Sequence, residues 1–315
     1  MNTPPLMPQI ALGRVLSIGE CMVEIAPSDT PDRYALGFAG DTFNTAWYLK
    51  ALRPDLSVAY LSRVGRDEMS DAMLRMMREA GIETDDIGRD AQRSVGAYLI
   101  SLRDGERSFS YWRDRAAARL LAEDPAALSA ALARADVIYF SGITVAILEG
   151  DGREALLGAV ADARSSGTRI IFDPNLRPRL WENADAMRDV VMASARVSDM
   201  ALPSFDDEAD WFGDADGTAT LARYAEAGCQ TVIVKDGAKP IHYQHADQRG
   251  IVALPAVAAV VDSTSAGDSF NAGLLAQLDS GADIETCLRN AAAVSRQVIG
   301  QRGALTQLDR GALAF

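Results

Sequence analysis

The feature that most constrains the fold is a regular alternation of short apolar runs and longer amphipathic segments between residues 136 and 235. The apolar runs have the length of strands, and the segments between them carry apolar residues at helical spacing. Their connections are short, which favours strand–helix–strand units with parallel strands and helices on both faces of the sheet. The predicted strands are 136–141, 168–172, 200–202 and 231–235, and the predicted helices are 153–163, 186–195 and 218–227.

The first third of the chain shows the same order of strand-like and helix-like segments. It also contains shorter runs in which apolar and polar residues partly alternate, which is typical of a small side sheet. Asp104-Gly105 joins two of these runs and is a strong hairpin signal. We therefore predict one domain over residues 1–315: a three-layer, doubly wound, mainly parallel α/β fold with a small inserted β-sheet as a lid. The lid strands come from about 20–40 and 93–113, and the other early elements are strands at 15–20 and 57–64 and a helix at 67–80.

The charge and the cysteines exclude several classes of partner. The chain has 31 Lys and Arg against 44 Asp and Glu, a net charge of −13, which argues against nucleic acid or an anionic membrane. No apolar run has the length of a membrane span, and no secretory signal is visible at the start. Cys21, Cys229 and Cys287 fit no disulfide or metal spacing, so we expect a reducing cytoplasm. His242 and His245 point to opposite faces of a predicted strand, which argues against a shared metal.

Polar clusters follow the predicted strands at the edge where open α/β sheets bind ligands. They are the segments 173–177 and 235–238 and the turn that contains Asp268. In that turn, small residues lead directly into an apolar-periodic helix. The free N–H groups and the dipole of the first helical turn form an anion site there, and Asp268 lies beside it as a candidate base. An aspartate at such a position is by itself most often only a helix cap.

The whole string supports the functional interpretation, because Asp262, Thr264, Ala266-Gly267-Asp268, Asn271 and Gly273 resemble the C-terminal signature of the ribokinase-like (PfkB) sugar kinases. The resemblance implies that Asp268 is the catalytic base and that the backbone of Ser265, Ala266 and Gly267 forms an anion hole for the transferred phosphoryl group. Residues 37–46 resemble the N-terminal signature, in which Gly40, Asp41 and Asn44 would bind the sugar; Ala39 replaces the first of two glycines that are usual there.

The same resemblance implies ATP as the phosphoryl donor and Mg²⁺ as its counter-ion. The chain has neither a P-loop nor a dinucleotide fingerprint, so the Asp268 turn would replace both. The family's Asn-x-x-Glu motif lacks its Asn here, where Ser204 stands, which leaves Asp207 and Glu208 as alternatives for organising Mg²⁺ through water. Residues 262–264 resemble a monovalent-cation loop, so K⁺ is a further candidate ligand. The residues expected at ATP are Asn175, Ser204, Lys235, Gly237, Gly267 and Asn271.

Several strings resemble one subgroup of the family, whose members phosphorylate 2-keto-3-deoxygluconate on its terminal (6-) hydroxyl. These strings are residues 18–22, 39–45, 111–113, 141–143 and 172–181. The subgroup implies that Arg113 and Arg177, with Tyr98 and Tyr111, hold the sugar acid. The chemistry agrees, because an arginine fork grips a planar carboxylate with paired, charge-assisted hydrogen bonds.

Three alternatives remain at this point. The first is a kinase of the same fold acting on fructose, ribose, a nucleoside or the galactonate epimer. The second is a non-catalytic sugar-acid sensor, against which an intact Asp268 argues. The third is a nucleotide-dependent oxidoreductase, which the missing fingerprint makes remote. We expect small-molecule partners and a homo-oligomer formed through the lid sheet, since a small exposed sheet needs cover for its edges or its open face.

Overall fold

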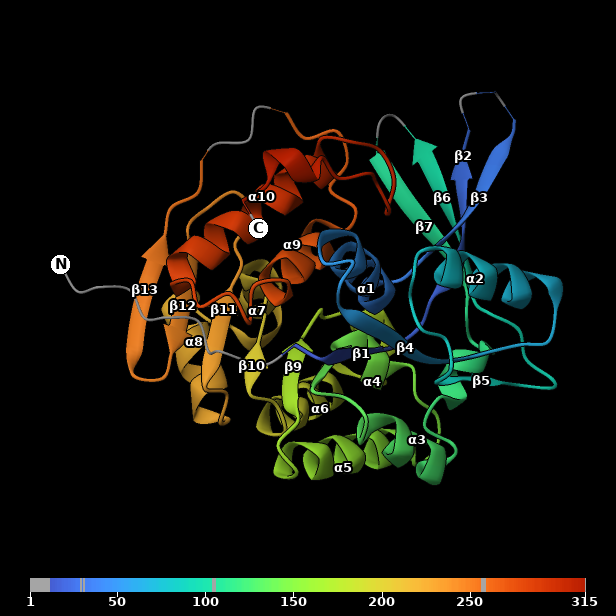
Figure 1. The fold of residues 1–315 in the computed structure, drawn as a ribbon, viewed down its shortest axis with the longest axis horizontal. Helices are drawn as coiled ribbons and strands as arrows, with labels where there is room; N and C mark the ends of the chain where they lie inside the picture. Colours follow the sequence, from blue (N-terminus) through green and yellow to red (C-terminus); the bar gives the residue numbers. More distant parts are fainter. Residues whose placement is uncertain (1–11, 29, 31, 104–105, 256–258, 315) are drawn as a thin grey trace.

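The computed structural model describes residues 12–28, 30, 32–103, 106–255 and 259–314. Two sheets organise these residues (Figure 1). The larger is nine-stranded with the order β13-β12-β11-β10-β9-β8-β1-β4-β5. Its strands are β1 (Arg14–Ile18), β4 (Ser57–Val64), β5 (Ile87–Arg89), β8 (Val137–Ser141), β9 (Arg169–Asp173), β10 (Met200–Ala201), β11 (Thr231–Val234), β12 (Ile241–His245) and β13 (Gln248–Val252).

The larger sheet is parallel from β5 to β11, and only β12 and β13 at one edge pair antiparallel among the described strands. This confirms the predicted mainly parallel α/β fold. The four strands predicted between residues 136 and 235 occur as β8, β9, β10 and β11. Both histidines lie in β12, as expected, and no group of three His, Cys, Asp or Glu in the described residues could hold a metal.

Helices cover both faces of this sheet (Figure 1). One face carries α1 (Asp41–Leu52), α2 (Glu68–Glu79), α9 (Ala266–Leu275) and α10 (Ile284–Ile299), and the other carries α3 (Pro125–Leu132), α4 (Gly142–Ala146), α5 (Gly152–Ser165) and α6 (Ala184–Arg196). The alternation along β1 divides the two cores, since Val15 packs with the first set and Leu16 with the second. Helix α3 was not predicted, although Asp124 caps it and Pro125 starts it, which is a recognisable start signal.

The smaller sheet has the order β3-β2-β6-β7 and stands beyond the carboxyl end of β1 (Figure 1). Its strands are β2 (Met22–Pro27), β3 (Tyr34–Ala39), β6 (Ala97–Arg103) and β7 (Glu106–Trp112). This confirms the predicted side sheet, whereas the Asp104-Gly105 turn lies outside the described residues. One face of the sheet packs Met22, Tyr98 and Ile100 against Ala304. Among the helices described, none is long and apolar enough to cross a membrane.

Candidate active site

Asp268 lies in the first turn of α9, behind a turn whose last residue, Ser265, has the left-handed φ of 60°. The N–H of Ala266 donates to the carbonyl of Ser263 at 3.2 Å, so it is already engaged. The N–H groups of Gly267 and Asp268 donate to no acceptor in the described part of the chain. An anion at this helix end would therefore meet the N–H groups of Gly267 and Asp268. Of the predicted Ser265, Ala266 and Gly267, this set includes Gly267.

Asn44 of α1 fixes the orientation of the Asp268 carboxylate. Its Nδ2 donates to Asp268 Oδ2 at 2.8 Å and to Ser265 Oγ at 2.9 Å, and its Oδ1 accepts from the N–H of Gly40. These contacts use both amide hydrogens, and the residue is only 5% exposed. Asn44, which is expected at the sugar, is thus engaged with Asp268 and Ser265. Gly40 lets the chain pass close to the Glu20 carbonyl, because a Cβ on Gly40 would lie 2.0 Å from that oxygen.

The surroundings of Asp268 raise the pKa of its carboxyl to about 7. Burial contributes most, followed by the negative charge of Asp41, while the hydrogen bond from Asn44 and the charge of Lys235 act in the opposite direction. A carboxylate with a pKa near neutral is matched to the task of a general base. The geometry and the charge of the site therefore both suit proton abstraction by Asp268.

A cation and its anchors lie beside the same helix end. Lys235, which directly follows β11, donates from Nζ to Asn271 Oδ1 at 3.1 Å and lies 3.6 Å from Asp173 Oδ1. A Cβ built on Gly267 would lie 3.8 Å from the same Nζ, so the ammonium faces the anion-binding turn. The side chain of Asn271, which is expected at ATP, is fully buried behind Lys235.

The other residues expected at ATP lie on the loops after the strands. Asn175 follows β9 and donates to Asp41 Oδ2 at 2.8 Å, which joins two predicted site residues. Ser204 pairs with Lys235 in an isolated parallel bridge, and Gly237 has a positive φ of 53° in the exposed loop after β11. These residues surround Lys235 and Asp41 at one edge of the sheet, as the strand-end rule predicts.

The residues expected to hold the sugar acid fall into two groups, one at the small sheet and one near Asp207. Tyr98 and Tyr111 face each other across β6 and β7, and the Tyr98 hydroxyl donates to Glu24, whose charge together with burial raises the pKa of Tyr98. Arg113 is 7% exposed and forms an ion pair with Glu20, which follows β1. Sequence reasoning missed both glutamates, although Glu20 ends the first strand beside a turn glycine, where ligands of open sheets gather.

Arg177 forms the second group. Its Nη1 lies 3.7 Å from Asp207 Oδ2, and half of its side chain is exposed. Asp207 lies on α7 (Phe205–Phe212), where burial and the charge of Asp173 raise the pKa of its carboxyl. Its position next to Lys235 and Arg177 suits a carboxylate that organises a metal through water, because Mg²⁺ takes few protein ligands beside phosphate oxygens.

Glu208, the other alternative for organising Mg²⁺, is engaged with a neighbouring helix. Its carboxylate is fully buried and accepts from Arg223 at 2.7 Å and from Tyr224 at 3.0 Å, both on α8 (Gly217–Glu226). Burial raises the pKa of Glu208 to about 7 despite these partners. One residue along a helix turns a side chain by about 100°, so Asp207 faces the site while Glu208 faces the neighbouring helix.

Asp262, in the predicted cation loop, is also engaged. Its Oδ1 accepts from the N–H of Thr264 at 2.9 Å and its Oδ2 from the N–H of Gly303 at 2.8 Å. The carboxylate thus ties the segment before α9 to the segment after α10.

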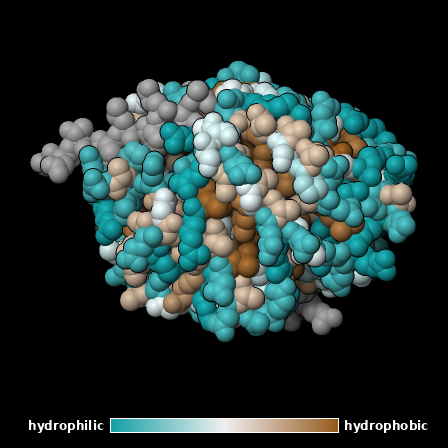
Figure 2. Space-filling view, turned by 90° about the horizontal axis from the view of Figure 1, so that it is seen from below, coloured by the Kyte–Doolittle hydropathy of each residue, from teal (hydrophilic) through white to brown (hydrophobic). Residues whose placement is uncertain are grey.

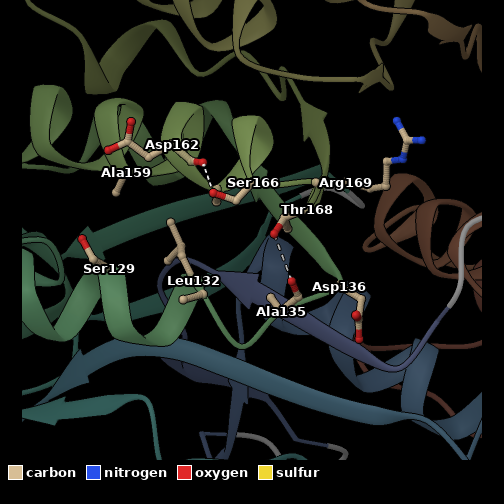
Figure 3. Close-up of a pocket in the computed structure, with 12 residues that line it drawn as sticks. Ser129, Leu132, Ala135, Asp136, Ala159, Asp162, Ser166, Thr168 and Arg169 are labelled. Carbon is tan, nitrogen blue, oxygen red and sulfur yellow. Dashed lines mark hydrogen bonds between the residues drawn. The ribbon is translucent and has the colours of Figure 1, made fainter.

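A cavity of about 660 Å³ lies elsewhere, between α3 and α5 (Figure 3). Asp136, Thr168 and Arg169 line it at the amino ends of β8 and β9, opposite to the end where Asp268 lies. Its hydroxyls and carboxylates do not converge on one point, and Asp136 already accepts from the N–H of Arg14 at 2.7 Å. The underside of the molecule is mostly hydrophilic around a narrow hydrophobic band (Figure 2). We therefore place the active site at Asp268.

Comparison with known proteins shows similarity to one family over nearly the whole chain. The family model described as "pfkB family carbohydrate kinase" matches residues 13–310. The 2-dehydro-3-deoxygluconokinase of Haemophilus influenzae is 35% identical over 308 residues, covering 96% of this chain and 97% of that protein. The enzyme of the same name from Escherichia coli K12 is 36% identical, covering 93% and 96%. A crystal structure of fructokinase with bound ATP from Xylella fastidiosa superposes with a TM-score of 0.79 at 26% identity, covering 93% and 94%.

Proposed function

The chain belongs to the pfkB family of carbohydrate kinases and is a sugar kinase, and from this premise we propose that its substrate is 2-keto-3-deoxygluconate. The product would be 2-keto-3-deoxy-6-phosphogluconate, with ATP as the donor. The observation that carries the proposal is the Asp268 turn, in which an oriented carboxylate with a pKa near 7 adjoins two free N–H groups and an ammonium. The names of the relatives at 35% and 36% identity support this substrate.

In the proposed reaction, the terminal hydroxyl of the sugar acid attacks the γ-phosphorus of ATP. Asp268 Oδ takes the hydroxyl proton as the new O–P bond forms, and the bond to the bridging oxygen breaks so that ADP leaves. The N–H groups of Gly267 and Asp268, with the Lys235 ammonium, stabilise the charge on the transferred group. Mg²⁺, held through water by Asp207, would neutralise phosphate charge when bound.

The sugar acid would lie between Asp268 and the small sheet. Tyr98 and Tyr111 line the face of that sheet that is turned toward the body of the protein, and Arg113 directly follows its strand β7. We propose that Arg113 and Arg177 receive the substrate carboxylate, Arg113 through the Nε edge of its guanidinium, which has no hydrogen-bond partner among the described residues. Gly40 and Asp41 would contact the hydroxyls at the other end.

One observation favours a second candidate, a kinase of a neutral sugar such as fructose. Glu20 already compensates the charge of Arg113 in a buried ion pair. An arginine that only stabilises the small sheet, and binds no substrate carboxylate, would form the same ion pair with Glu20. The substrate panel below separates the two candidates.

The proposal is tested by ATP consumption with Mg²⁺ on 2-keto-3-deoxygluconate, its galactonate epimer, fructose, ribose and gluconate. We expect a keto-deoxy acid as the best substrate, with turnover falling about 10²–10⁴-fold in Asp268→Asn. Arg177→Met should raise the KM for the acid and leave the KM for any neutral substrate unchanged. Fructose or ribose as the best substrate would contradict the arginine assignment and favour the second candidate. Absence of turnover on the whole panel would contradict the proposed substrates.

We also propose that two copies associate through the outer face of the small sheet. Tyr34, Leu36 and Trp112 are each more than half exposed on this face, and a small apolar sheet face is commonly covered by a partner. Sedimentation velocity should give a dimer for the wild type and a monomer for Leu36→Glu. A monomeric wild type at micromolar concentration would contradict this assembly.

A further inference from the structure

We propose that Asn271 is a positioning residue: its buried amide holds the Lys235 ammonium next to the anion-binding turn. This inference rests on the proposed function, because it concerns the same phosphoryl transfer. Asn271 lies one turn after Asp268 on α9, and its side chain is fully buried beneath the site. It acts through Lys235 and has no contact of its own with ATP.

The Asn271 amide forms three hydrogen bonds within the protein, which leaves only one lone pair of its oxygen unused. Oδ1 accepts from Lys235 Nζ at 3.1 Å, while Nδ2 donates to Asp173 Oδ2 at 2.8 Å and to the Tyr139 hydroxyl at 3.0 Å. The three partners come from the loop after β11, from β9 and from β8. The amide therefore connects α9 to β8, to β9 and to the loop after β11, on the side of the sheet where the carboxyl ends of these strands lie.

Only an amide satisfies this set of partners. Asp173 and Lys235 carry opposite charges, and the bridge needs two donors on one atom and an acceptor on the other. A carboxylate at residue 271 would meet Asp173 with a like charge, and an apolar side chain would leave the buried Asp173 oxygen and the Tyr139 hydroxyl without this donor.

The amide also controls where the ammonium lies. Lys235 Nζ is 3.6 Å from Asp173 Oδ1, which is longer than a direct charge-assisted hydrogen bond of about 2.7–2.9 Å. With Asn271 in place, the ammonium stays between Asp173 and the turn, 3.8 Å from a Cβ built on Gly267. Without the amide, nothing would prevent Lys235 from moving onto the Asp173 carboxylate and away from the turn.

The position of this cation matters for Asp268 as well. The charged groups that face Asp268 are Asp41 from α1, Asp173 from β9 and Lys235 from the loop after β11. The two carboxylates raise the pKa of Asp268, and Lys235 lowers it. A displaced ammonium would thus weaken phosphoryl stabilisation and make the base harder to ionise at the same time.

A double-mutant cycle tests the inference on the full-length protein, after wild-type turnover of a substrate has been established. The variants are Asn271→Leu, Lys235→Met and the pair, each assayed for kcat, KM for ATP and the pH dependence of kcat/KM. We expect Asn271→Leu to lower kcat by up to about 10²-fold and Lys235→Met by about 10²–10³-fold. The pair should be no slower than Lys235→Met alone, because Asn271 has no effect once the ammonium is gone.

The acidic limb of kcat/KM should move to higher pH in all three variants, and by the same amount in the pair as in Lys235→Met alone. Asn290→Leu is the matched control, since the Asn290 amide on α10 contacts only Gln277 and Ala314 in the described residues. Losses that multiply in the pair, a wild-type kcat in Asn271→Leu, or an unmoved acidic limb would overturn the inference. These outcomes leave the wild-type activity standing, so they are distinct from failure of the proposed function.

If Asn271→Leu does not fold, Asp173→Asn makes the same test from the other side of the bridge. This variant replaces one oxygen by an amide nitrogen and removes the charge that draws Lys235 toward β9. Because Asp173 also raises the pKa of Asp268, kcat is compared at pH 9, where Asp268 is ionised in both backgrounds. There the effect of Asp173→Asn should disappear in the Lys235→Met background, and an effect that persists would overturn the inference.

Discussion

Glu20 and Arg113 form a buried ion pair that joins the two sheets, since Glu20 follows β1 and Arg113 follows β7. Their side chains are 1% and 8% exposed. Glu20 Oε1 and Arg113 Nε have no hydrogen-bond partner among the described residues. Gly96 makes room for the pair, because a Cβ there would lie 2.6 Å from Glu20 Oε1. The ion pair therefore fixes how the small sheet stands over the active site.

We expect Glu20→Gln to destabilise the protein by about 3–5 kcal/mol, because it leaves the buried Arg113 charge without its counter-ion. Urea unfolding measures this change. Glu68→Gln is the matched control: its ion pair with Arg75 is exposed at both ends, and its loss should cost less than about 1 kcal/mol. Equal stability losses in the two variants would show that the Glu20 pair contributes nothing beyond a surface contact.

The kcat/KM of the enzyme should rise with pH through a limb near 7, because Asp268 must be ionised to act as a base and its pKa is about 7. Asn44→Leu removes the hydrogen bond that favours the ionised carboxylate, so the limb should move to higher pH. Initial rates between pH 5 and 9 measure both values. A limb that stays in place or moves down in Asn44→Leu would contradict the assigned role of Asn44.

Asp268→Asn should stabilise the fold at pH 8 while it removes activity. The folded-state pKa of Asp268 lies above its unfolded value, so this residue favours folding below about pH 4 and loses that contribution as pH rises through 7. Asparagine does not titrate, and the gain at pH 8 is at most about 4 kcal/mol. Thermal unfolding at pH 4.5 and 8 measures it. A larger gain at the lower pH would contradict the raised pKa.

Two glycines of α9 should respond in opposite ways to alanine. Gly267→Ala adds a methyl in ordinary contact with Lys235, 3.8 Å away, where the transferred group would approach the turn. We expect kcat to fall about 10²-fold with the unfolding midpoint unchanged. Gly273→Ala would place a Cβ 2.9 Å from the Ala291 backbone, which should cost about 1–3 kcal/mol and leave kcat per folded molecule near wild type. Circular dichroism and steady-state rates separate the two effects.

Asp207 and Glu208 should differ in their effect on Mg²⁺. Asp207→Asn is expected to raise the Mg²⁺ concentration for half-maximal rate by about 10–100-fold. Glu208→Gln should leave that concentration unchanged, because the Glu208 carboxylate is buried against Arg223 and Tyr224. Titration of the rate with Mg²⁺ at pH 7 decides between them. The reverse pattern would restore Glu208 as the metal-organising residue.

The sequence alone determined the architecture and predicted a location for the site. Apolar periodicity and turn residues are local signals, and they were sufficient to predict the parallel sheet, the side sheet and the helix that presents Asp268. The strand-end rule predicted that the segments 173–177 and 235–238 lie together, because the carboxyl ends of parallel strands share an edge, and Lys235 does lie 3.6 Å from Asp173.

Only the tertiary structure decided which side chains face the site and which partners they have. Asn271 lies one helical turn beyond Asp268 yet is buried, Glu208 follows Asp207 yet turns to the next helix, and Asn44 contacts Asp268 across 224 residues of sequence. Such pairings arise from packing between distant elements, where each buried polar atom takes the partner that its position allows. The spacing of residues in the sequence therefore does not predict which partner a buried polar atom has.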